Sequence, residues 1–209
     1  MMFSIHPYQP LVEHQQLLRQ CRACAAMIPP VIVGEPVLTP ILSLGQAPGI
    51  HEGEIGRPFG WTAGRTLFKW FESIGVDEAT YRHNVYMCAV CRCFPGRNHK
   101  GGDRVPDRQE IANCAHWLQT EIGLLQPQLI ILIGKLAIQQ FLPVSKLDAV
   151  VGRLHTVLLN EREVQLAPLP HPSGLSTWFR TEPGKTLLNQ SLIAIQAHPA
   201  WQNLMKANK

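Results

Sequence analysis

The sequence lacks any apolar stretch long enough to cross a membrane, and it lacks long runs of charge. A membrane-spanning helix needs about 18 uninterrupted apolar residues, and no segment of the 209-residue chain approaches that length. Charged residues make up only 16% of the chain and hydrophobic residues 45%, a balance that excludes bulk disorder. The first ten residues, MMFSIHPYQP, contain neither a basic nor an apolar segment, so we expect no secretion signal and a cytoplasmic location.

The chain does have enough length and apolar surface for one folded domain. A domain usually has about 100 to 200 residues, so we predict a single domain over residues 1–209. The net charge of +4 permits a polyanionic partner without requiring one. Seventeen prolines and sixteen glycines predict many shaped loops, and loops on a rigid scaffold often carry binding and catalytic residues.

Apolar runs alternate with segments of helical spacing along most of the chain. Buried strands are predicted at 38–45, 84–93, 128–134 and 164–170. Helices are predicted at 11–20, 65–75, 107–124, 135–142 and 184–197, the third with a capping box formed by Asp107 and Glu110. This alternation favours a three-layer α/β/α sandwich around a short, mainly parallel sheet of about four strands.

Three loops leave the predicted strands at their carboxyl ends, where ligands bind in such sheets. The first, GQAPGIHEGEIGRPF from Gly45, is predicted to hold little regular structure, and its backbone amides can turn into a cavity as in anion-binding nests. The second, from Cys93, is long and basic. The third begins at His171, which is well placed to donate a hydrogen bond to a ligand. Taken singly, such a loop is often plain surface and such a histidine is more often structural.

Six cysteines in a chain expected to be cytoplasmic need an explanation other than disulfides. Two form a C-x-x-C, three crowd one segment and one stands apart: Cys21 and Cys24, then Cys88, Cys91 and Cys93, then Cys114. Metal binding or catalysis is the favoured explanation. Four sulfur ligands suit zinc and an iron–sulfur cluster equally well.

Taken together, these segments resemble the uracil-DNA glycosylase superfamily. The shared features are GQAPG followed by GRPF, the CFPG turn and HPSGLS near the end, and the cysteines are similar to those of the iron–sulfur branch, families 4 and 5. The resemblance runs from about Cys21 to the final helix. It implies a monomeric enzyme that hydrolyses the N-glycosidic bond of uracil, or of other deaminated bases, in DNA and so initiates base excision repair. The first and third loops contain no lysine nucleophile, so we expect no lyase activity.

The resemblance also implies a [4Fe–4S] cluster. The matching ligands are Cys21, Cys24, Cys93 and Cys114. The last two lie further apart than is usual for the family, which fits a local insertion around HKGGD, residues 99–103. Cys91 is the alternative to Cys93, and zinc is the alternative to the cluster. We expect the cluster to lie away from the substrate pocket and to hold the N-terminal helix in place.

For the reaction, the resemblance implies that His171 donates to the base oxygen on which negative charge grows as the bond breaks. Phe59 matches the aromatic residue on which the base stacks. The rest of the base pocket is Gln46, Ala47, Gly49 and Ala89.

Other residues are expected at the DNA backbone and in the duplex. Ser173 would hold a phosphate, and Leu175 would fill the gap that the extruded base leaves. Arg57, Arg65 and the basic loop 97–104 would contact further phosphates, although any one such arginine is more often a solvated surface charge.

This chain departs from the best-known members, which carry GQDPY. Ala47 stands where an aspartate positions or activates water, and Gly49 stands where a tyrosine excludes thymine. Ala89 falls where other members read the base with asparagine. The loss of both polar groups makes the sequence more similar to family 5, which accepts a broader set of bases. We expect His51 or Glu52 to handle the water, although a lone acid in a loop is about as often simply solvated.

Two other functions stay open at this point. A non-catalytic iron–sulfur DNA-binding protein of the same fold is compatible with the missing aspartate and asparagine. A redox protein that uses Cys21 and Cys24 is compatible with the C-x-x-C. His171→Ala separates the enzyme from the binder, because only an enzyme would lose its rate.

Overall fold

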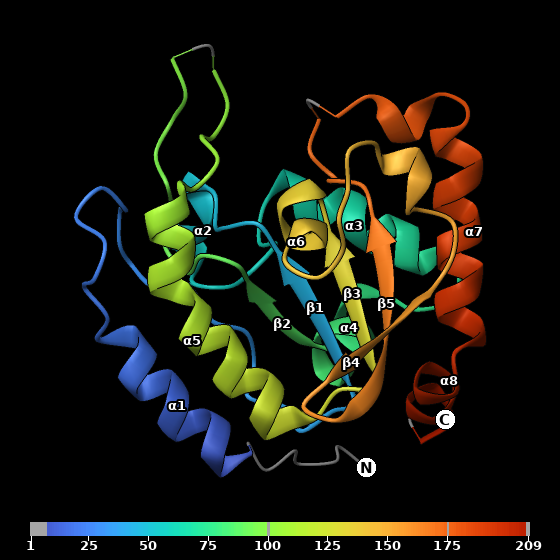
Figure 1. Cartoon of the computed structure of the whole chain (residues 1–209), viewed down its shortest axis with the longest axis horizontal. Coiled ribbons are helices and arrows are strands. Elements are labelled where there is room, and N and C mark those ends of the chain that lie inside the picture. The colour runs from blue at the N-terminus through green and yellow to red at the C-terminus, as the bar shows by residue number, and fades with distance from the viewer. Residues whose placement is uncertain (1–7, 100, 175, 208–209) are drawn as a thin grey trace.

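The computed structural model describes residues 8–99, 101–174 and 176–207 (Figure 1). Within these residues, five strands form one sheet in the order β2-β1-β3-β5-β4. The strands are β1 (Ile41–Gly45), β2 (Tyr86–Ala89), β3 (Leu129–Ile133), β4 (His155–Leu159) and β5 (Arg162–Leu169). β1, β2, β3 and β5 run parallel, and β4 pairs antiparallel with β5. The predicted α/β class and its parallel strands are therefore confirmed, with one strand more than expected.

The additional strand is β4, at the edge of the sheet. It is joined to β5 by the two-residue turn Asn160 and Glu161, whose φ angles of 48° and 63° suit a tight hairpin. Side chains along β4 alternate between partly buried and exposed, and Leu158 is 69% exposed. β1 and β3, in contrast, are buried at every position. The sequence analysis found strands that are buried on both faces and missed this half-exposed one.

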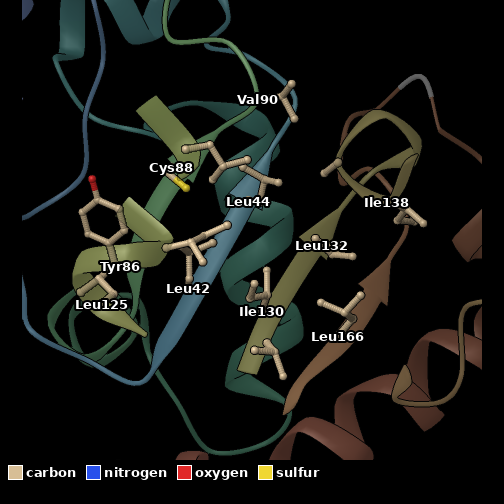
Figure 2. Close-up of a cluster of buried hydrophobic side chains, with 14 of the residues drawn as sticks. Leu42, Leu44, Tyr86, Cys88, Val90, Leu125, Ile130, Leu132, Ile138 and Leu166 are labelled. Atoms are coloured by element: carbon tan, nitrogen blue, oxygen red, sulfur yellow. The ribbon is translucent and has the colours of Figure 1, made fainter. Parts of the chain in front are cut away.

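Helices cover both faces of the sheet. They are α1 (Gln9–Arg19), α2 (Ile50–Ile55), α3 (Thr62–Glu72), α4 (Glu78–Asn84), α5 (Arg108–Leu125), α6 (Lys135–Gln139), α7 (Gly184–Ala197) and α8 (Pro199–Ala207). Leu42, Leu44 and Ile130 face a core shared with α1, α5 and α6 (Figure 2). Ile41 and Ile131 face the opposite core, shared with α3, α4, α7 and α8. Successive strand residues thus point to opposite layers, which makes the predicted three-layer sandwich.

Three helices lie outside the predicted elements. α2 is in the glycine-rich loop that was expected to hold little regular structure, and the carboxylate of Glu52 caps it by accepting from the amide of Gly49. α4 begins where Asp77 accepts from the amide of Thr80. α8 follows α7 directly, so the predicted final helix is not the last one. Pro199 ends α7, because proline has no amide to donate, and it suits the first turn of α8.

Local signals were reliable at α5. Asp107 accepts from the amide of Glu110 at 2.9 Å, and Glu110 accepts from the amide of Asp107 at 2.8 Å, which confirms the predicted capping box. None of the helices in the described part of the chain is both long and apolar enough to cross a membrane.

Candidate active site

A cavity of about 520 Å³ lies at the carboxyl ends of β1 and β2 and beside the loop that follows β5. Those strand ends point toward the top of Figure 1, where α2 also lies. The predicted residues that line the cavity are Gln46, Ala47, Gly49, His51, Glu52, Phe59, Ala89, His171 and Ser173. The parallel sheet therefore brings together, in one crevice, the three loops that the sequence analysis singled out.

Phe59 forms one wall of the cavity, and its ring lies against the end of β1. A Cβ at Gly45 would be 3.1 Å from the Phe59 ring, so glycine at that position lets the ring approach the strand. Phe59 has a φ of 52°, which is unusual for a residue with a side chain. Arg82 of α4 holds this backbone by donating to the carbonyl oxygens of Pro58 at 2.8 Å and Phe59 at 3.0 Å. The sequence analysis did not single out Arg82, because its role depends on contacts across two loops.

Glu52 holds the loop after β1 closed on itself. Its Oε2 accepts from the amide of Gly49 at 2.5 Å, and its Oε1 accepts from the amide of Gly60 at 3.1 Å. The side chain is buried, and burial raises the pKa of its carboxyl, while the backbone amides of the loop act in the opposite direction. Both oxygens are thus engaged by the loop itself.

His51 lies at the mouth of the cavity. Its ring centroid is 4.6 Å from that of Trp61, and its Nδ1 is 3.9 Å from a carboxylate oxygen of Glu54. The side chain is 45% exposed, so water reaches it freely.

His171 follows β5 and is held in one orientation. Its Nδ1 accepts from the amide of Ser173 at 3.3 Å, so the neutral ring carries its proton on Nε2. Burial lowers the pKa of His171, which favours this neutral form. Gly134, at the end of β3, has a φ of 90°, and a Cβ there would be 3.1 Å from the His171 ring. The site therefore contains a partly buried, neutral N–H donor packed against the sheet.

Asp103 also lines the cavity, and the sequence analysis did not select it. It lies in the basic loop, where Arg97 and Asp103 form an antiparallel bridge, and Arg97 lines the cavity as well. The insertion at residues 99–103 was the feature of the sequence that could have indicated Asp103. The position of Asp103 over the cavity, however, depends on how the basic loop folds back.

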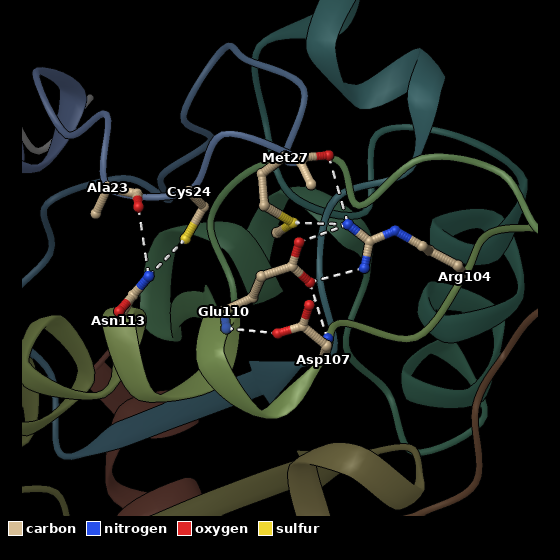
Figure 3. A network of polar contacts seen from close by, with 8 residues as sticks. Ala23, Cys24, Met27, Arg104, Asp107, Glu110 and Asn113 are labelled. Carbon is tan, nitrogen blue, oxygen red and sulfur yellow. Dashed lines mark hydrogen bonds and ion pairs between the residues drawn. The ribbon is translucent and has the colours of Figure 1, made fainter.

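The predicted DNA-contact residues occupy several environments. Arg57 and Arg65 lie outside the set of described residues that line the cavity. The Arg57 guanidinium is 3.6 Å from Glu78, and the Arg65 guanidinium lies over the ring of Trp61 at 5.5 Å. Arg104 of the basic loop is occupied by Glu110, at 2.5 and 2.7 Å (Figure 3). Leu175 lies outside the described residues.

A second cavity, of about 250 Å³, is lined by the predicted cluster ligands Cys21, Cys24, Cys93 and Cys114. Among the described residues, none lines both cavities. The pKa of Cys93 is raised to about 11, first by burial and then by the proximity of the other three thiols. Cys88 and Cys91 are buried in the hydrophobic core, as predicted, and in the described part of the chain neither borders this second cavity.

The four cysteines are not arranged around one point. Within residues 8–99, 101–174 and 176–207, no three His, Cys, Asp or Glu side chains are grouped so that they could hold one metal ion. A single zinc ion needs sulfur ligands about 2.3 Å from its centre. Trp117 lines the same cavity, and its buried indole N–H has no hydrogen-bond partner among the described residues.

Comparisons with known proteins place this geometry in context. A family model described as the uracil DNA glycosylase superfamily matches residues 32–193. A type-4 uracil-DNA glycosylase of Thermotoga maritima is 32% identical over 162 residues, which are 76% of this chain and 79% of that protein. A type-4 uracil-DNA glycosylase of Pyrobaculum aerophilum is 30% identical over 65% of this chain and 67% of its own. A type-5 enzyme of the same organism is 26% identical over 65% and 62%.

A solved structure has the same fold. The wild-type SMUG2 protein of Pedobacter heparinus superposes with a TM-score of 0.51, covering 90% of this chain and 97% of that one. Its sequence identity is 14%, so the likeness concerns the fold alone.

Proposed function

Because the chain belongs to the uracil DNA glycosylase superfamily, we propose that it is a monofunctional DNA glycosylase that hydrolyses the N-glycosidic bond of uracil in DNA. This reaction would initiate base excision repair. The observation that carries the proposal is the partly buried, neutral His171, which shares one cavity with the aromatic wall of Phe59.

The cavity suits a base that has left the duplex. Flipping a nucleotide costs a few kcal/mol, which a shaped pocket must recover. Stacking a base on an aromatic ring is worth about 1–3 kcal/mol, and Phe59 supplies that ring. Ala89 offers no side-chain amide to the base edge. The proposal therefore includes other deaminated bases, such as hypoxanthine, as substrates.

His171 acts on the departing base. As the glycosidic bond breaks, negative charge grows on the base and positive charge on the sugar, so a donor aimed at the base stabilises the transition state more than the substrate. The Nε2–H of neutral His171 is such a donor. Losing one donor of this kind costs about 10²–10³-fold in rate.

The test is release of the base from oligonucleotides that carry one uracil, hypoxanthine or thymine, with alkali used to cut the abasic product. We expect uracil release by the wild type, a loss of about 10²-fold or more in His171→Ala, and a near-normal rate in His83→Ala. His83 is a matched control because it is exposed on α4, outside the described residues that line the cavity. Absence of release from every base, with DNA still bound, would instead support a non-catalytic DNA-binding protein.

We further propose that Cys21, Cys24, Cys93 and Cys114 hold a [4Fe–4S] cluster. The support is that all four line one cavity with Trp117, whose buried indole N–H has no hydrogen-bond partner among the described residues. The cluster would supply a structural cross-link between the segment after α1, the segment after β2 and α5. Cys24 already accepts from the side-chain amide of Asn113 on α5 at 3.3 Å (Figure 3).

Metal and sulfide analysis of the anaerobically purified protein tests this ligand set. We expect iron and acid-labile sulfide in equal amounts, about four per chain, a loss of both in Cys93→Ser, and retention in Cys91→Ser. Zinc without sulfide would overturn the cluster. Retention of the cluster in Cys93→Ser with loss in Cys91→Ser would overturn the choice between these two cysteines. Cysteines that react freely with an alkylating reagent in the intact protein would favour the redox alternative.

The proposal includes DNA as the partner of a monomer in the cytoplasm, where reducing conditions keep cysteines as thiols. Ser173 would contact a phosphate beside His171. Arg57 and Arg65 would contact phosphates farther from the cavity, since both side chains reach solvent. Sedimentation of the free protein and of its DNA complex would reveal any higher oligomer.

A further inference from the structure

Hydrolysis needs an acceptor that holds the attacking water and takes its proton. Of the two residues that the sequence predicted for this step, Glu52 is already engaged and His51 lies at the exposed mouth of the cavity. Both oxygens of Glu52 accept backbone amides of their own loop. His51 packs on Trp61 at the mouth of the cavity, with Glu54 beside its Nδ1. Ala47 has no polar side chain at all.

Asp103 is the carboxylate in the cavity whose oxygens are available. Its Oδ2 would be 3.2 Å from a Cβ placed on Gly49, so it lies directly beside the loop after β1. Asp103 is an exposed residue, and among the described residues no hydrogen bond or ion pair engages its carboxylate; the charges of Arg97 and His51 act on it at longer range. A carboxylate with unfilled acceptor sites in a substrate cavity can hold water.

The loop that carries Asp103 is held firmly at its base. The amide of Arg104 donates to the carbonyl of Gly96 at 2.9 Å, which closes the hairpin beside the Arg97–Asp103 bridge. The guanidinium of Arg104 makes two bonds to Glu110 at the start of α5, as Figure 3 shows. Glu110 is itself held by the capping box with Asp107. The first turn of α5 thus positions Arg104, which follows Asp103 in the chain.

We propose that Asp103 holds the attacking water and accepts its proton, an inference that rests on the proposed glycosylase function. In this step the bond between C1′ and the base nitrogen breaks, and its electron pair leaves with the base, on which His171 stabilises the charge. The water oxygen forms the new bond to C1′, and its proton passes to the Asp103 carboxylate. The released base then takes a proton from solvent.

Two further properties suit Asp103 to this role. Although Asp103 is exposed as a residue, the loss of solvent around its carboxyl raises the pKa of that group, against the attraction of Arg97 and His51, and a carboxylate with a raised pKa is a better proton acceptor. Its negative charge also stabilises the positive charge that develops on the sugar. Asp103 would thus supply from a different loop the polar group that is missing at Ala47.

The experiment is single-turnover uracil release by Asp103→Asn and Asp103→Ala, with Glu54→Gln as the matched control. Glu54 lies on α2, is 81% exposed, and is outside the described residues that line the cavity, so this change removes the same charge from the same face. We expect Asp103→Asn to lower the rate by about 10²-fold or more, with unchanged affinity for abasic-site DNA and an unchanged melting temperature. Added formate should restore part of the rate of Asp103→Ala, because a free carboxylate can then hold the water.

Each alternative outcome is distinct. A wild type that releases no base would refute the proposed function itself. An active wild type with a normal rate in Asp103→Asn would refute the role of Asp103. Release of thymine by Asp103→Ala at an unchanged uracil rate would make Asp103 a specificity residue and would also refute it. A lower melting temperature with no rescue by formate would show that Asp103 is only structural.

Discussion

Replacing Arg82 with leucine should loosen the wall of the cavity and weaken base stacking. The Arg82 guanidinium donates to the carbonyls of Pro58 and Phe59 at 2.8 and 3.0 Å and to Glu78 at 2.8 Å. Its side chain is only 13% exposed, whereas that of Glu78 is 41% exposed. The two carbonyl bonds therefore carry most of the effect, and the ion pair carries little.

The magnitude follows from these contacts. A hydrogen bond to a charged group contributes about 1.5–3 kcal/mol, and solvent can partly replace the lost donors, so the loss should total about 2–4 kcal/mol. For a chain of this size, each kcal/mol shifts the melting temperature by about 2–4 °C, so Arg82→Leu should melt about 4–16 °C lower. If the Phe59 ring then loses the 1–3 kcal/mol of stacking, uracil release at 25 °C should fall about 5- to 150-fold.

Thermal unfolding and single-turnover release would be measured side by side, with Glu78→Gln as the control. Glu78→Gln removes the half-exposed ion pair and keeps both carbonyl bonds, so it should cost at most about 1 kcal/mol and keep a near-normal rate. An unchanged melting temperature in Arg82→Leu would refute the energetic reasoning. A normal release rate in a destabilised Arg82→Leu would show that Phe59 does not need this support.

Three further predictions concern other parts of the site. Burial lowers the pKa values of His171 and His198, so the unfolded chain takes up protons at a higher pH than the folded chain does. The free energy of unfolding should therefore fall as pH drops below about 6.5. Urea unfolding at several pH values should show a less steep fall in His171→Gln. Gly134→Ala should destabilise by about 1–3 kcal/mol and slow uracil release, because its φ of 90° and the 3.1 Å contact force His171 to move; an unchanged rate would contradict this. Arg57→Gln and Arg65→Gln should each reduce the slope of log affinity for DNA against log salt by about 1, and an unchanged slope would remove that residue from the phosphate contacts.

The sequence was sufficient for the layers of the fold and for the residues that follow each parallel strand. β1, β3 and the core-facing part of β5 are short apolar runs between loops, and burial on both faces requires such runs. Because the carboxyl ends of parallel strands meet at one edge, the loops of Gln46 and His171 had to lie near each other. The motifs around Phe59 and His171 lie in these loops, so they indicated residues that line the cavity.

The sequence was not sufficient where an element or a role depends on hydrogen bonds that leave no apolar periodicity in the chain. β4 is a half-exposed edge strand that exists because it pairs with β5, and α2 forms where Glu52 accepts the amide of Gly49. The same kind of contact engages both oxygens of Glu52, one of the two residues that the sequence predicted to handle the water.

Asp103 shows the difference most clearly. By sequence it is an acid in a basic loop, 54 positions after Gly49, as the residue numbers give. In the folded chain its carboxylate lies beside Gly49, because a hairpin anchored by Arg104 and Glu110 carries it there. Local patterns of apolar and polar residues determine which segments become strands and helices. Which side chains share a cavity depends on long-range packing, and only the tertiary structure decided that.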